Sequence, residues 1–352
     1  MAGAILLAIL VCGTTGCSTL AYYAQSVNGH LDLLQRARPV PQWLADSHTG
    51  DRLKQRLVLS QEIRDYAVHE LGLPDNASYR RYADLQRGAA VWNVVAAPEL
   101  SLTLQTWCFP VVGCVSYRGY FDRASADAYA AQVRATGLEV GVYGVPAYST
   151  LGKLPFDALA DPLLNTFIDY PEGELARLVF HELAHQVAYA ADDTVFNESF
   201  AVAVERIGGA RWLAEPIRSA ARDEYQKLDE RRNQFRALTA AYRDRLHAIY
   251  ESARADAEKR SAKATLMAQL RADHERLKRD RWAGYAGYDN WFAGANNASF
   301  GVLAAYSELV PSFEQLFERQ GRDFPRFYSE VRRLAALPVQ ARRAALTAPP
   351  GD

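Results

Sequence analysis

The chain has 352 residues, of which 49% are hydrophobic and 23% are charged, the composition of an ordinary globular protein with enough apolar material for a sizeable core. Its formal net charge of −1 provides no excess of basic residues. We therefore expect no nucleic-acid partner.

An apolar run near the N-terminus, residues 4–11, is too short to cross a bilayer, which takes about 20 residues. It suits the apolar core of a signal peptide. The run is followed by Thr-Gly-Cys-Ser at positions 15–18, which resembles the lipobox of bacterial lipoproteins. We therefore expect residues 1–16 to be a signal peptide and Cys17 to carry a lipid.

Two departures weaken the lipobox: no Lys or Arg precedes the run, and Thr14 stands where leucine is usual. A soluble protein with an apolar N-terminus is the alternative. A lipid on Cys17 would tether the protein to a membrane facing the periplasm. Ser18 after the cysteine is typical of lipoproteins sent to the outer membrane.

Hydrophobic periodicity and turn residues predict an N-terminal half that mixes helices with short strands. The expected helices cover residues 22–35, 52–71 and 123–136, and the expected strands cover residues 89–97 and 138–145, with two more within 107–117. Because the strands come first and helices follow, we predict a mainly helical α+β fold.

Cysteine usage supports export. The signal peptide and the lipid account for Cys12 and Cys17, which leaves Cys108 and Cys114. In an oxidising compartment two cysteines so close are expected to form a disulfide that clamps a hairpin. Two free buried thiols or a metal-binding pair are the alternatives, although a tetrahedral structural site would need further ligands.

The chain is organised around the sequence His-Glu-Leu-Ala-His at positions 181–185. Apolar spacing predicts a helix over residues 174–191, on which His181 and His185 project from one face and can bind a single zinc ion. Glu182 lies about 100° around that helix and can serve as the general base toward a water on the metal. A chance match with two half-buried imidazoles is the alternative.

A second helical pattern, residues 197–205, follows a short polar turn. An antiparallel return would bring Glu198 back beside the histidines as the third ligand of a catalytic zinc site. Asp192 and Asp193 are rivals, but they fall in the turn. Glu205 lies about 10 Å further along the helix. We expect Glu205 at the surface, with a hydrogen bond to a ligand histidine as the alternative.

These motifs resemble the gluzincin metallopeptidases, whose third zinc ligand is a glutamate on a following helix. More closely, the chain is similar to bacterial predicted aminopeptidase lipoproteins from Cys17 to about Leu334. Besides the two zinc helices, the stretches that carry this resemblance are residues 107–110, 113–114, 117–121, 145–152 and 296–298.

The resemblance implies a small sheet above the zinc helix, whose edge strand binds the peptide substrate through its main chain. Ala147, Tyr148 and Ser149 are the candidates, with an ordinary loop as the alternative. It also implies a tyrosine hydroxyl that stabilises the oxyanion. Tyr306 and Tyr288 are the candidates for this role, and a place in the core is the alternative for each.

The segment from about residue 213 to 283 is rich in charged residues and has apolar residues at helical spacing. It predicts one long helix or a helical hairpin, expected to be a solvated arm, with partner binding as the alternative. We expect the peptidase domain to span residues 17–340 with this arm inserted. A final helix is predicted over residues 323–335, and residues 341–352 are expected to be a disordered tail.

We therefore predict a zinc-dependent peptidase with one zinc ion per chain, an aminopeptidase by resemblance, acting on peptides or proteins in the bacterial envelope. The rivals are an endopeptidase acting on envelope proteins and a non-catalytic scaffold in which the zinc is structural. Glu182 argues against the scaffold, because a structural site has no use for a base.

Overall fold

The computed structural model describes residues 22–109, 113–147, 160–305 and 308–348. Four of the predicted functional residues, Cys17, Tyr148, Ser149 and Tyr306, lie outside these ranges.

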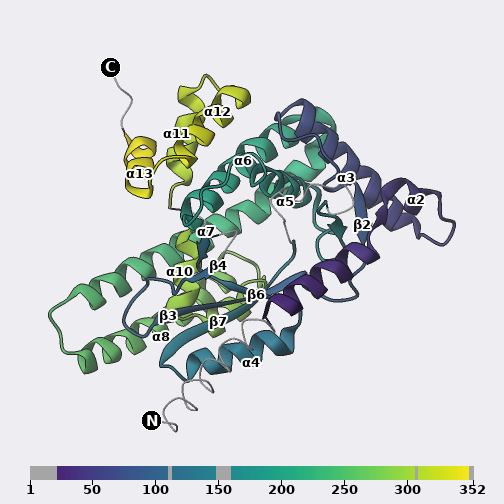
Figure 1. Cartoon of the computed structure of the whole chain (residues 1–352). Helices are drawn as coiled ribbons and strands as arrows, with labels where there is room; N and C mark the ends of the chain where they lie inside the picture. Colours follow the sequence, from purple (N-terminus) through teal and green to yellow (C-terminus); the bar gives the residue numbers. More distant parts are fainter. Residues whose placement is uncertain (1–21, 110–112, 148–159, 306–307, 349–352) are drawn as a thin grey trace, which may run out of the picture.

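Helices dominate the described residues, with short strands concentrated in the first half of the chain (Figure 1). The strands are β1 (Arg38–Pro39), β2 (Arg81–Ala83), β3 (Val91–Pro98), β4 (Trp107–Phe109), β5 (Gly113–Val115), β6 (Arg118–Tyr120), β7 (Leu138–Val145) and β8 (Leu163–Leu164). The helices, after a helical stretch at residues 22–36, are α2 (Val40–Ala45), α3 (Asp51–His69), α4 (Arg123–Arg134), α5 (Glu172–Ala184), α6 (Thr194–Ala214), α7 (Ser219–Glu251), α8 (Asp256–Asp280), α9 (Asp289–Gly294), α10 (Asn297–Ala305), α11 (Val310–Arg319), α12 (Phe324–Ala335) and α13 (Val339–Thr347).

An antiparallel sheet in the order β6–β3–β7 forms one half of the fold. Other elements cover both faces of its central strand β3, and β3 accordingly has apolar residues on both faces. Val94 and Ala96 face the cluster that includes α4, whereas Val95 and Ala97 face the cluster that includes Ala298 of α10. The strands predicted at residues 89–97 and 138–145 are therefore confirmed.

Two smaller sheets complete the strand inventory of the described residues. Strand β2 pairs with β1 antiparallel and with β8 parallel, and β4 pairs with β5 as a hairpin. The hairpin confirms the two short strands predicted within residues 107–117.

The second half is a helical layer built on α5 and α6, which pack against each other and against α3 and α11. The largest apolar cluster lies here, with Leu175, Val179 and Leu183 of α5 fully buried. Helix α10 contacts both α6 and β3, so it joins the helical layer to the sheet (Figure 1). The prediction of a mainly helical α+β fold is confirmed.

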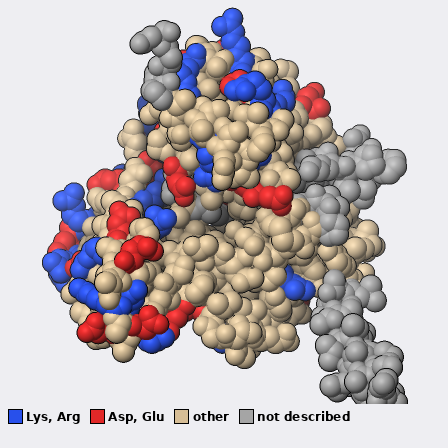
Figure 2. All heavy atoms as spheres, turned by 60° about the vertical axis from the view of Figure 1, so that its left-hand side comes forward, with Lys and Arg blue, Asp and Glu red and all other residues tan. Residues whose placement is uncertain are grey.

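The charged segment folds as a helical hairpin of α7 and α8, so the alternative of a single helix is wrong. The hairpin has an apolar cluster of its own, which includes Tyr242, Leu246 and Leu270. Figure 2 turns this side of the molecule forward and shows acidic and basic side chains intermixed on it. The hairpin is thus a packed element with a highly charged surface.

The C-terminus differs from the prediction. Residues 339–347 form helix α13 instead of part of a disordered tail. The reason is that Arg342 is buried and pairs with Asp193 at 2.8 Å, and Leu346 is buried in the main core. Arg343 pairs with the same carboxylate at 2.6 Å.

Among the described residues, the structure has no helix with both the length and the apolarity needed to cross a membrane.

Candidate metal centre

Helix α5 presents His181 and His185 on one face. The helix ends at Ala184, so the prediction of a helix through residue 191 is wrong. His185 is the C-cap residue and keeps helical backbone angles, with φ −58° and ψ −23°. The two imidazoles therefore stay one turn apart, with ring centroids separated by 4.8 Å.

Side chains from outside α5 hold the backbone that follows the helix. Asn197 accepts a hydrogen bond from the Ala190 nitrogen and donates one to the Ala190 oxygen, both at 2.8 Å. The Nε of Arg332 donates to the Val187 oxygen at 3.1 Å. The chain then reverses into α6, whose first turn is capped by Asp193. The predicted return helix forms and is longer than residues 197–205.

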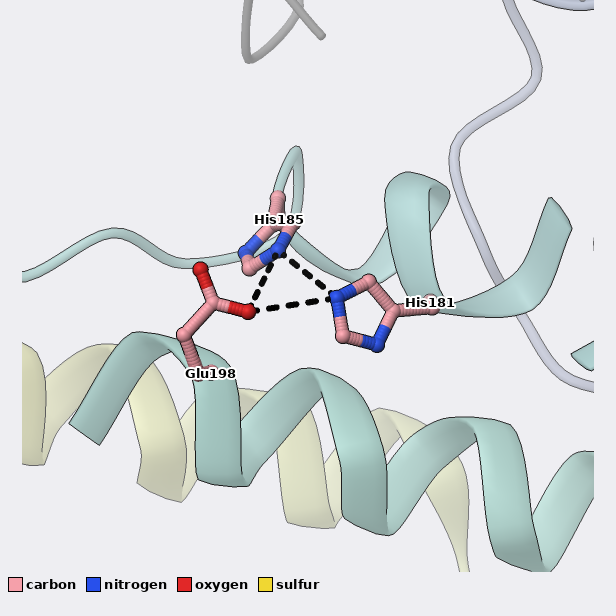
Figure 3. A group of neighbouring side chains, drawn as sticks. All are labelled: His181, His185 and Glu198. Atoms are coloured by element: carbon pink, nitrogen blue, oxygen red, sulfur yellow. Dashed lines mark hydrogen bonds and ion pairs between the residues drawn. The ribbon is translucent and has the colours of Figure 1, made fainter. Parts of the chain in front are cut away.

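Glu198 in the first part of α6 meets the two histidines (Figure 3). Its Oε2 lies 3.3 Å from Nε2 of His181 and 3.7 Å from Nε2 of His185, and the two Nε2 atoms are 3.2 Å apart. Two ligands at about 2.0–2.1 Å from a tetrahedral zinc ion lie about 3.3 Å apart. The three atoms thus have the spacing of ligands to one small cation.

The donor chemistry also fits a cation. Oε2 of Glu198 is buried beside the Nε2 atoms of both histidines, an arrangement that is costly unless a positive charge is shared among these atoms. Burial lowers the pKa of His185 to about 4, which keeps this imidazole neutral and able to coordinate.

The carboxylates of both Glu198 and Glu205 lie against the imidazole of His181. Burial lowers its pKa, but hydrogen bonds with Glu198 and Glu205 outweigh this effect and raise the pKa well above its usual range. A field that favours a proton at Nε2 also favours a metal ion there, since both are cations competing for the same lone pair. The residues present therefore fit a divalent cation.

Glu182, between the two histidines in sequence, is not one of the three clustered donors. Burial raises the pKa of its carboxyl group to about 7; the charge of His181 opposes this shift, and the neighbouring carboxylates, Glu198 first, add to it. A carboxylate with a pKa near neutrality can accept a proton and return it. This is the chemistry expected of a general base beside a metal-activated water.

Glu205 is largely enclosed, with a side chain only 13% exposed, so the prediction of a surface residue is wrong. Its Oε2 accepts a hydrogen bond from Nδ1 of His181 at 3.0 Å, and its Oε1 pairs with Arg177. Arg177 was not singled out from the sequence. The available signal was its position four residues before His181, which places both side chains on one face of α5.

A family model for "Aminopep: Putative aminopeptidase" matches residues 21–346. The chain belongs to the Aminopep family. The comparisons with curated proteins and with solved structures gave no match. The matched span contains α5 and α6 with the three clustered donors, and it also contains the helical hairpin and most of α13. Membership in the Aminopep family agrees with a peptidase.

Of the other residues predicted for the site, the structure describes Ala147 and Tyr288. Ala147 is buried in the main core two residues after β7, and β7 is an outer strand of its three-stranded sheet. Tyr288 is partly buried and packs against the apolar cluster of the helical hairpin, where its ring stacks on Phe235 with 4.3 Å between centroids. Tyr288 thus has a packing role close to the core position that was its alternative.

A tyrosine that the sequence did not single out lies nearer to the clustered donors. Tyr117, just before β6, packs against the face of the sheet that α10 covers. Burial raises its pKa, and the charges of Glu198 and Glu182 raise it further. Its hydroxyl therefore remains a proton-bearing donor at any ordinary pH. The signal that could have identified it is its place in the conspicuous aromatic run at residues 117–121.

The disulfide of this Aminopep chain joins Cys108 to Cys114, which face each other across the β4–β5 hairpin. The disulfide prediction is confirmed. The hairpin contacts the connection between α5 and α6, because the Cys114 nitrogen donates to Oδ1 of Asp192 at 2.6 Å. Asp192 is thus committed to the hairpin.

We expect the native protein to be unreactive at Cys108 and Cys114 toward a thiol alkylating reagent until a reductant is added. Cys108 is exposed, so a free thiol there would react at once. Mass spectrometry of the peptides around the two residues checks this. In Cys108→Ser, the remaining Cys114 should become reactive without reduction. Labelling of both cysteines in the unreduced wild-type protein would contradict the pairing.

Proposed function

We propose that the protein is a zinc-dependent peptidase in which His181, His185 and Glu198 hold one zinc ion. The observation that carries the proposal is the convergence of one donor atom from each residue, all within 4.8 Å of one another. Three protein ligands, which leave one position open, are the pattern of a catalytic zinc site, whereas structural sites use four.

In this mechanism Glu182 provides the proton transfers. When bound, zinc would polarise the peptide carbonyl and lower the pKa of a bound water. Glu182 takes the proton from the attacking water and later delivers it to the leaving amine, and its raised pKa suits both steps. Tyr117 is a hydrogen-bond donor for negative charge that develops on the carbonyl oxygen, with Tyr306 as the other candidate.

Aminopeptidase activity is the form of the proposal that the family description supports. The substrate would be a peptide or protein bound in extended form along an outer strand of the sheet. Ala147, Tyr148 and Ser149, directly after β7, are the proposed segment. An endopeptidase acting on envelope proteins remains the second form of the same chemistry.

The proposal is tested by metal analysis combined with a cleavage profile on a peptide library. We expect about one zinc per chain, cleavage that a chelator abolishes, and recovery on adding zinc. Peptides with free and with acetylated N-termini are the matched pair. An aminopeptidase cleaves only the free form, and an endopeptidase cleaves both. A protein that binds no zinc would refute the proposal, as would a zinc-loaded protein that cleaves no peptide.

We also propose that the protein is tethered by a lipid on Cys17 to a bacterial membrane, facing the periplasm. Support comes from the lipobox-like sequence and the apolar run before it. Replacing Cys17 with serine removes the only group that can accept the lipid there, so we expect the protein to move from the membrane to the soluble fraction. Unchanged fractionation of Cys17→Ser would contradict the tether, and Cys108→Ser is the control for loss of a cysteine.

A further inference from the structure

We propose that Glu205 and Arg177 are positioning residues for the metal ligand His181, and that they fix which of its ring nitrogens faces the metal. This inference rests on the proposed zinc site and concerns residues to which the family match assigns no role. The pair acts from the side of the imidazole that is turned away from Glu198.

The contacts of His181 define two separate sides of the ring. Nδ1 lies 3.0 Å from Oε2 of Glu205, and Nε2 lies 3.3 Å from Oε2 of Glu198. A carboxylate only accepts hydrogen bonds, so Nδ1 must carry the proton in the contact with Glu205. The proton at Nδ1 leaves the lone pair of Nε2 for the metal, and the carboxylate raises the basicity of the ligand.

Arg177 keeps Glu205 charged and in place. The two side chains are only 6% and 13% exposed, and their ion pair uses the second carboxylate oxygen, Oε1. A guanidinium held against a largely enclosed carboxylate stabilises its charged form. Both oxygens of Glu205 therefore have fixed partners, so the carboxylate has one orientation.

Helices α5 and α6 approach closely enough for this arrangement because α6 has two glycines, Gly208 and Gly209, where it faces α5. A Cβ at Gly209 would lie 2.8 Å from Cγ of Arg177, and one at Gly208 would lie 2.6 Å from Leu71 and 3.0 Å from Phe180. Larger residues at these positions would force α5 and α6 apart. The close approach thus places Glu205 against the Nδ1 side of the His181 ring.

The pair is also the inner end of a longer chain of charges that reaches the helical hairpin. Arg177 lies 3.8 Å from Glu174, and Glu174 pairs with Arg232 of α7 at 2.5 Å. The Arg232 side chain is 17% exposed. Helix α7 of the hairpin is therefore connected, through Arg232 and Glu174, to the residues that position His181.

Glu205→Gln and Glu205→Ala in the full-length protein test the proposal. Gln keeps the size and an acceptor oxygen but removes the charge, and Ala removes the contact. The control is Arg206→Gln, the next residue of α6, whose ion pair with Glu314 is 43% and 33% exposed. Zinc affinity is measured by competition with a chelator. The visible absorption spectrum of the cobalt-substituted protein reports the geometry of the ligands independently of turnover.

We expect Glu205→Gln to bind zinc about 10- to 100-fold more weakly, the range for partners that orient metal ligands, with an altered cobalt spectrum. Glu205→Ala should lose at least as much affinity, and Arg206→Gln should match the wild type. Wild-type affinity and spectra in both Glu205 variants would overturn the proposal. Loss of the fold in both would assign the pair to helix packing and also overturn it. A wild-type protein without zinc would instead refute the proposed function.

Discussion

Replacing Glu198 with alanine is expected to remove zinc from the protein and abolish peptide hydrolysis. Without Glu198 the site keeps two histidines, fewer than the three protein ligands of a catalytic zinc. We expect zinc affinity to fall by more than about 100-fold, beyond the range for partners that only orient a ligand. The measurement is zinc content after dialysis, together with turnover of a peptide substrate.

The rival candidates for the third ligand, Asp192 and Asp193, have other partners in the structure. Asp192 accepts from the Cys114 nitrogen, and Asp193 pairs with Arg342 and Arg343. The best control is Asp192→Asn, because Asn keeps an acceptor oxygen and tolerates the positive φ of 63° at this position. Asp193→Ala is unsuitable, since breaking a buried ion pair costs roughly 3–5 kcal/mol of folding stability. Full zinc occupancy in Glu198→Ala would transfer the third-ligand role to another residue.

The second large effect is expected for Glu182→Gln. This variant should keep its fold and its zinc but lose at least about 100-fold in turnover, the scale of a lost general base. Gln has nearly the same shape as Glu but cannot take up the proton of the attacking water. The experiment compares kcat and zinc content of the variant and the wild type. Loss of zinc would show that Glu182 is a ligand and that the assignment of the base is wrong.

Local sequence was enough to predict the parts of the site that depend on one element. His181 and His185 follow from helical spacing alone, and the confirmed strand β7 follows from eight residues of sequence. Glu198 required one further assumption, a short reversal between two helices. The close approach of its carboxylate to both histidines agrees with that assumption.

What the sequence could not provide depends on contacts between distant segments. Apolar residues continue after His185, so the pattern extends the helix, whereas in the structure Arg332 bonds to the backbone of Val187 and Asn197 to that of Ala190 outside the helix. Whether Glu205 is buried depends on how closely α6 packs on α5. The tail was predicted to be disordered because the partner of Arg342 and Arg343, Asp193, lies about 150 residues earlier and cannot be identified from local sequence.

The pairing of Asp193 with Arg342 and Arg343 has a consequence for the order of events during synthesis. The N-cap residue of α6, Asp193, lies five residues before Glu198 and gains these partners only when the last helix of the chain has been made. A nascent chain that already has both histidines would therefore still lack the support for the third donor. Completion of the three-donor site would therefore wait for the C-terminal helix.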